Sequence, residues 1–131
     1  MSPTAQFVVF LVSTVVALVV VVVTGMRGAR KAHVVAVAAT VVCLALAIRA
    51  ALGVGEHYDL EAAGIVTPIH LWIAKVTTAA YLLPVVTGVL TWRNDRWRNL
   101  HGKLAFVVLA LTVVTTATGS LMLLWAEPIT P

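Results

Sequence analysis

The four histidines of this chain are its main candidates for binding chemistry. His33 and His101 each follow a short basic stretch and precede a long apolar run, whereas His57 and His70 flank an acidic stretch. Neutral imidazole is the commonest metal ligand among protein side chains. Two imidazoles from neighbouring helices are the usual ligands of a six-coordinate b-type haem, and bundle cores build such sites from facing helices. The histidines therefore raise the hypothesis of haem or metal binding, which depends on the elements that position them.

Composition predicts that those elements are membrane-spanning helices. Hydrophobic residues make up 61% of the 131-residue chain and charged residues only 11%, about half the charged fraction of a soluble domain. Because a spanning helix needs roughly 20 apolar residues, four segments qualify, at 7–25, 32–54, 67–92 and 100–125. Short links favour antiparallel neighbours. We therefore predict one all-α domain over residues 1–131, an up-down four-helix bundle in the membrane, with Pro84 bending the third helix.

Lysine and arginine gather in two of the three links, which predicts the orientation of the helices. The first link carries Arg27, Arg30 and Lys31, and the third link with its flank carries Arg93, Arg96, Arg98 and Lys103. The amino-terminal tail, the second link and the carboxyl-terminal tail carry no lysine or arginine. Basic loops stay on the cytoplasmic side, so both termini are expected outside the cell membrane. The net charge of +4 comes from these basic loops, which are expected to contact anionic lipid. The charge therefore does not require nucleic acid as a partner.

This topology sorts the histidines into two layers. His33 and His101 begin the second and fourth helices on the inner side, and His57 and His70 lie on the outer side. An unbroken helix would hold His33 and His57 ~36 Å apart, so the two layers cannot form one site. We expect one or two b-type haems, with His33 and His101 as the firmest pair. His57 is the weakest candidate because it lies in a loop.

Each helical histidine heads a stripe of small or weakly polar residues, which predicts a face packed inward. Positions 18 residues apart share a helix face, and His-x17-Gly occurs twice, each time with threonine before the glycine. The stripes are Ala36, Thr40, Ala47 and Ala51 below His33; Ala74, Thr77, Tyr81, Pro84 and Gly88 below His70; and Ala105, Val108, Thr112, Thr115 and Gly119 below His101. The first helix, with Ser13 and Thr14 as its noted polar groups, is interpreted as scaffold.

Two cations lie within predicted spans that contain no acidic residue. Arg49 is in the second helix and Lys75 in the third, and intramembrane cations are functional candidates by default. They would pair with haem propionates, since carboxylates are natural partners of arginine and lysine. The alternatives are that their long side chains extend to the membrane surface, or that Arg49 pairs with an acid of the outer loop.

The sequences RKAH, PIHLWIA and RNLHGKLAF…TATGSLMLL, with an arginine near the outer end of the second helix, resemble the small YozB/CtaM-type membrane proteins, a family without an assigned function. The resemblance covers the second to fourth helices. It implies four membrane helices, histidines at helix ends including His33, His70 and His101, and a role near respiratory haem or copper, with some members linked to haem–copper oxidase maturation. Di-haem cytochromes of the b561 type are more loosely similar.

Three functions remain open from the sequence. The first is a b-type haem protein of the plasma membrane, acting in respiratory electron transfer or oxidase assembly, with His57 or Met122 opposite His70. The second is copper handling by His57, His70 and Met122, because imidazole and thioether suit Cu(I). The third is an accessory subunit of a larger membrane complex. The acidic outer loop would meet a soluble redox partner, and haem redox is the only catalytic route that the residues offer.

Overall fold

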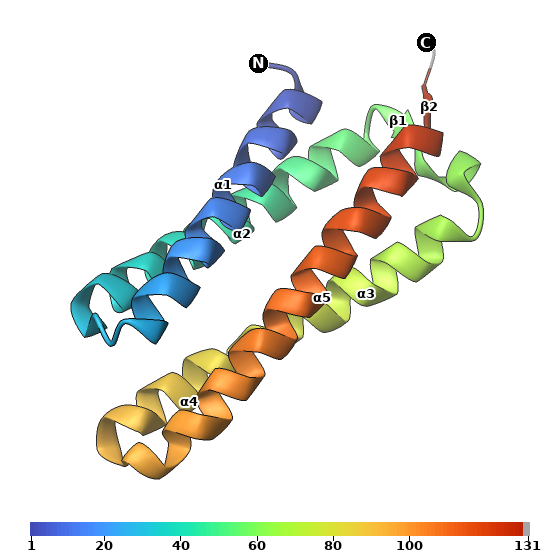
Figure 1. The fold of residues 1–131 in the computed structure, drawn as a ribbon. Coiled ribbons are helices and arrows are strands. Elements are labelled where there is room, and N and C mark those ends of the chain that lie inside the picture. Colours follow the sequence, from blue (N-terminus) through green and yellow to red (C-terminus); the bar gives the residue numbers. More distant parts are fainter. Residues whose placement is uncertain (130–131) are drawn as a thin grey trace. The chain divides into compact units, whose positions relative to one another are not determined.

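The computed structural model describes residues 1–129, which form five α-helices and four short elements. Figure 1 shows their order along the chain. The helices are α1 (Pro3–Met26), α2 (Arg30–Gly55), α3 (Val66–Ala80), α4 (Leu82–Arg93) and α5 (Arg98–Trp125). The short elements are the 3₁₀ turns η1 (Leu60–Ala63) and η2 (Asp95–Trp97) and the strands β1 (Tyr58–Asp59) and β2 (Glu127–Pro128).

The all-α prediction is confirmed for every long element of the described residues. Four helical segments are long and apolar enough to cross a membrane: Pro3–Met26, Arg30–Gly55, Val66–Arg93 and Asp95–Trp125. Each begins one to five residues before the predicted start and ends no more than one residue after the predicted end. The two-residue strands pair with each other and were not predicted, since two residues carry no alternating pattern.

The helices group into two compact units. The first holds Met1–Tyr58 with Pro128 and Ile129 of the described carboxyl-terminal end, and the second holds Asp59–Glu127. In the first unit α1 packs along α2, and in the second α5 packs along both α3 and α4 (Figure 1). Each unit is therefore an antiparallel helix pair closed by a short turn.

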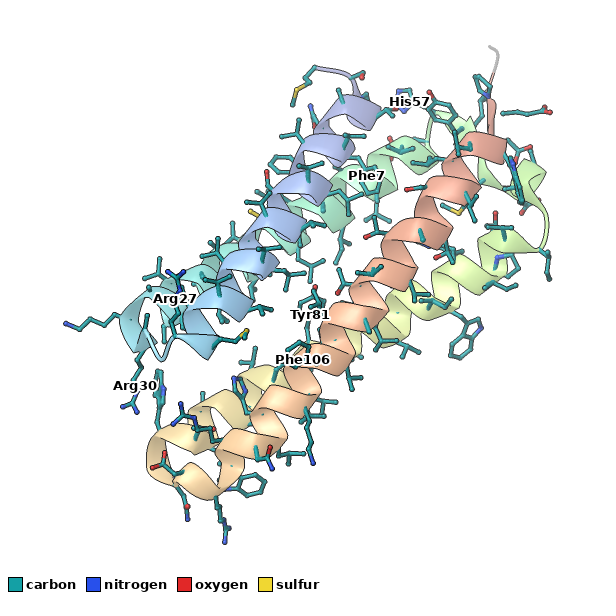
Figure 2. The ribbon with its side chains drawn as sticks, in the orientation of Figure 1. Phe7, Arg27, Arg30, His57, Tyr81 and Phe106 are labelled. Carbon is teal, nitrogen blue, oxygen red and sulfur yellow. The ribbon has the colours of Figure 1, made fainter. Side chains whose placement is uncertain are left out.

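Local sequence explains how the first pair begins and turns. The Ser2 hydroxyl accepts the Ala5 N–H at 3.2 Å and caps α1, and Pro3 occupies the first helical position, where its missing N–H costs nothing. The turn to α2 places Gly28 at φ +67°, a backbone conformation that glycine adopts without a steric penalty. Arg27 and Arg30 flank this turn (Figure 2).

Small residues line the interior of both units, as the predicted stripes required. Buried positions on α2 include Ala36, Thr40 and Ala47, and those on α5 include Thr112 and Gly119. Large apolar side chains instead lie on the outer faces, where Val16 is 58% and Leu52 71% exposed. This arrangement suits lipid contact, because close backbone packing of small residues, not burial of large ones, holds membrane helices together.

The third spanning segment is broken at Tyr81, between α3 and α4. Pro84 has no N–H to donate to the carbonyl of Ala80, the last residue of α3. The helix is therefore interrupted at the position that Pro84 predicts. The break brings the Tyr81 side chain to α5, where its hydroxyl lies 2.8 Å from Thr112 Oγ1. Tyr81 is labelled in Figure 2.

Cross-helix hydrogen bonds connect α3 and α4 with α5 along much of their length. Thr77 Oγ1 lies 2.8 Å from Thr115 Oγ1, one turn away from the pair of Tyr81 and Thr112. A hydroxyl in hydrocarbon without a partner is costly, so these pairs fix the register of α3 and α4 against α5.

We expect a double-mutant cycle on Thr77 and Thr115 to give a coupling of about 0.6 kcal/mol, the average for membrane helices. Thr→Val at each position removes the hydroxyl and keeps the branched shape, and unfolding in detergent micelles measures the coupling. Thr78 is the matched control, because its exposed hydroxyl donates to Ala74 of its own helix. A Thr78–Thr115 cycle as large as the Thr77–Thr115 cycle would contradict the assignment.

Candidate functional site

Three of the four histidines reach from the start of one helix to a threonine–glycine pair near the end of its partner. These pairs, each called a step, are Thr24–Gly25 on α1, Thr87–Gly88 on α4 and Thr118–Gly119 on α5. His33 meets the first step, His101 the second and His70 the third. The same kind of contact therefore occurs three times in the chain.

His70, in the first turns of α3, has the shortest contacts with its step. Its Nδ1 lies 3.0 Å from Thr118 Oγ1. A Cβ built on Gly119 would lie only 2.8 Å from His70 Cε1, closer than real Cβ contacts come. Glycine is therefore required for the ring to lie against the α5 backbone, and Gly119 is buried beneath it.

His101 repeats this arrangement at the other end of the second unit. Its Nδ1 lies 3.3 Å from Thr87 Oγ1, and a Cβ on Gly88 would lie 3.2 Å from its Cε1. Because α5 is antiparallel to the segment that contains α3 and α4, each histidine meets the glycine of the other helix. The histidine of each His-x17-Gly pattern thus contacts the glycine of the other pattern, so the two patterns together mark two contacts between helices.

His33 makes the corresponding contact in the first unit. Its Nδ1 lies 2.9 Å from the Val21 carbonyl oxygen and 3.4 Å from Thr24 Oγ1. A Cβ on Gly25 would lie 3.1 Å from its Cε1. The ring is therefore fixed to the last turns of α1, a contact that the sequence interpretation of this helix as scaffold did not include.

The step on α1 has a signal in the sequence, although reading each helix separately does not reveal it. The tetrapeptide VVTG occurs at residues 22–25 and again at 85–88, each time followed by a basic turn and then by a histidine that opens the next helix. The repeat relates Thr24, Gly25 and His33 to Thr87, Gly88 and His101. The stripes of small residues do not reveal the contact of His33 with Thr24 and Gly25, because each stripe describes a single helix and the contact joins two helices.

His57 differs from the other three. It follows α2, is exposed, and its Nδ1 lies 2.9 Å from the Gly53 carbonyl oxygen of the preceding turn. Figure 2 labels it near the end of that helix. Its place in a loop agrees with its low rank among the candidates, and it contacts no step.

The candidate ligands do not gather into a cluster within either unit. His70 packs on Gly119, which is 18 residues from His101 on α5, so the two rings are ~27 Å apart along the helix and cannot bind one ion. His33 and His57 belong to the first unit. No group of three or more His, Cys, Asp or Glu side chains that could hold a metal ion occurs among residues 1–129.

The remaining predicted residues lie at different depths. Arg49 and Lys75 are both exposed on the surfaces of α2 and α3, consistent with either pairing or extension to the membrane surface. Met122 is buried, with 7% of its surface accessible, one turn beyond Gly119 on α5. Its side chain is therefore on the packed side of that helix.

The donor chemistry of the three histidines fits an axial haem ligand. A ligating histidine usually bonds its second ring nitrogen to a carbonyl or another acceptor of the protein, which fixes the orientation of the ring. Each Nδ1 here has such a partner on the neighbouring helix. The residues beside the rings are glycine and threonine, which are small enough for close approach.

No family model, curated protein or solved structure matches this chain. The function is therefore inferred from the residues and their geometry.

We expect Gly119→Ala to destabilise the second unit. The new methyl would overlap His70 Cε1, and overpacking of this kind costs roughly 1–3 kcal/mol, more than the ~1 kcal/mol that alanine gains over glycine in a helix. Thermal unfolding in detergent micelles measures the change. Gly102→Ala on the same helix is the matched control, because nothing lies within 4 Å of a Cβ there. Equal stability changes for the two variants would refute the packing role of Gly119.

Proposed function

We propose that this chain is a multi-pass protein of the plasma membrane that binds b-type haem and acts in respiratory electron transfer or in haem–copper oxidase assembly. The observation that carries the proposal is the repeated seating of His33, His70 and His101. Each ring is held at a helix–helix interface through Nδ1, the arrangement expected of a ligand that binds through Nε2. The resemblance to YozB/CtaM-type proteins supports the same role.

In this proposal His33, His70 and His101 would each offer Nε2 to a haem iron, and His57 and Met122 are further candidate ligands. A bound haem would accept and release one electron at a time. The chain's own residues would fix the imidazole rings through the steps and exclude water with the apolar outer faces. Exposed Arg49 and Lys75 would neutralise the propionates, since charge-assisted pairs with carboxylates are the strongest available to them.

The proposed orientation places both termini outside and the basic turns in the cytoplasm. Its support is the separation of charge: the turn between α1 and α2 carries Arg27, Arg30 and Lys31, while the link between α2 and α3 carries Glu56, Asp59 and Glu61. Positive residues near helix ends are retained on the cytoplasmic side. The basic turns would also contact anionic lipid headgroups.

We expect single cysteines to report this orientation in intact cells. In a Cys43→Ser background, a membrane-impermeant maleimide should label Ala62→Cys and leave Ala29→Cys unlabelled until the cells are opened. Both positions are exposed, so accessibility to reagent differs only by side. Labelling of Ala29→Cys in intact cells would reverse the assignment.

We expect the purified chain, alone or after addition of haem, to show a Soret band that shifts on reduction. His33→Ala, His70→Ala and His101→Ala should each weaken this band, because each removes a proposed iron ligand. His57→Ala is the matched control and should keep the band, since His57 is exposed in a loop. A protein that stays spectrally silent with added haem would exclude the proposal.

A cofactor-free accessory subunit is the second candidate, and one observation favours it. The imidazole–glycine contacts hold the helix pairs together through packing and hydrogen bonding, as in membrane bundles. They would therefore explain the histidines without a cofactor. This candidate predicts co-purification with larger membrane subunits. It also predicts that His→Ala variants that still fold keep full function, whereas ligand histidines would not.

A further inference from the structure

The hydroxyl of Thr118 has acceptors for its only proton on its own helix. Thr118 Oγ1 lies within hydrogen-bonding distance of two backbone carbonyl oxygens, Val114 at 3.0 Å and Thr115 at 3.1 Å. A hydroxyl has one proton and two lone pairs. When that proton is donated to either carbonyl, the Thr118 oxygen is left as an acceptor toward His70 Nδ1, 3.0 Å away.

The acceptor at Thr118 determines which ring nitrogen of His70 carries the proton. A neutral imidazole has one N–H and one lone pair, and Thr118 requires the donor at Nδ1. With the hydroxyl proton on a carbonyl, Nδ1 of neutral His70 carries the ring proton, and the lone pair lies on Nε2.

The other two steps follow the same rule. Thr87 Oγ1 donates to the Leu83 carbonyl at 2.8 Å, and Thr24 Oγ1 donates to the Val20 carbonyl at 2.6 Å. Each threonine therefore presents an acceptor to its histidine, and His33 has the Val21 carbonyl as a further acceptor at Nδ1. The same arrangement of a threonine hydroxyl beside Nδ1 therefore occurs at three contacts.

We propose that Thr118 is a positioning residue that holds His70 as the Nδ1–H tautomer, so that Nε2 presents its lone pair to a metal ion or haem iron. The identity of the ligand rests on the proposed function, whereas the tautomer does not. A hydrogen bond at Nδ1 also raises the basicity of the ligand nitrogen, so the threonine would lower the reduction potential of a bound haem.

The test uses the full chain in detergent micelles, with ¹⁵N-labelled histidine and no added haem, at a pH where imidazole is neutral. Nitrogen chemical shifts distinguish the two tautomers, and His70→Gln identifies the His70 signals. We expect Nδ1–H in the wild type and in Thr118→Ser, which keeps the hydroxyl. Thr118→Val keeps the shape without the acceptor and should show a shift toward Nε2–H, with circular dichroism confirming that it folds.

An Nε2–H tautomer in the wild type, or identical signals in Thr118→Val, would overturn the proposal. The wild-type result decides even if Thr118→Val does not fold. Addition of haem provides a separate measurement, in which Thr118→Val should raise the midpoint potential relative to Thr118→Ser. A colourless protein with Nδ1–H would support the positioning role and exclude the haem function, whereas a coloured protein with Nε2–H would do the reverse.

Discussion

An imidazole ring lying against a glycine backbone is the contact on which each helix pair of this chain depends. It joins the start of one helix to the end of its antiparallel partner, at His33 and Gly25, at His101 and Gly88, and at His70 beside Gly119. A side chain larger than hydrogen at the glycine would push the ring away. The adjacent threonine supplies the polar partner that a ring nitrogen requires inside a membrane.

Four helices long and apolar enough to cross a membrane would depend on contacts of this kind. Lipid is as apolar as valine or leucine, so large side chains gain little by turning inward, and Val16 and Leu52 remain exposed. Close packing of small residues and hydrogen bonds between helices are the interactions left to specify pairing. The bond between Thr77 and Thr115 and the histidine steps are interactions of this kind.

The geometry that packs the helices would also orient a ligand. A ring fixed at Nδ1 on a neighbouring helix is a packing contact, and under the proposed function its orientation would no longer have to be fixed when iron binds. The exposed His57 lacks this arrangement. The surroundings therefore separate His33, His70 and His101 from His57, whereas residue type alone would treat all four histidines as equivalent.

Sequence alone determined the four apolar helices, their inward stripes and the break caused by Pro84, because helix length, a period of 3.6 residues and a missing N–H are local properties. It also selected His33, His70 and His101 as candidates. Only the tertiary structure decided what these rings contact. In the antiparallel pairs, the histidine of each His-x17-Gly pattern contacts the glycine of the other pattern, and His33 contacts Thr24 and Gly25 of α1. The partner of each histidine lies on another helix, and periodicity along one segment carries no information about that helix.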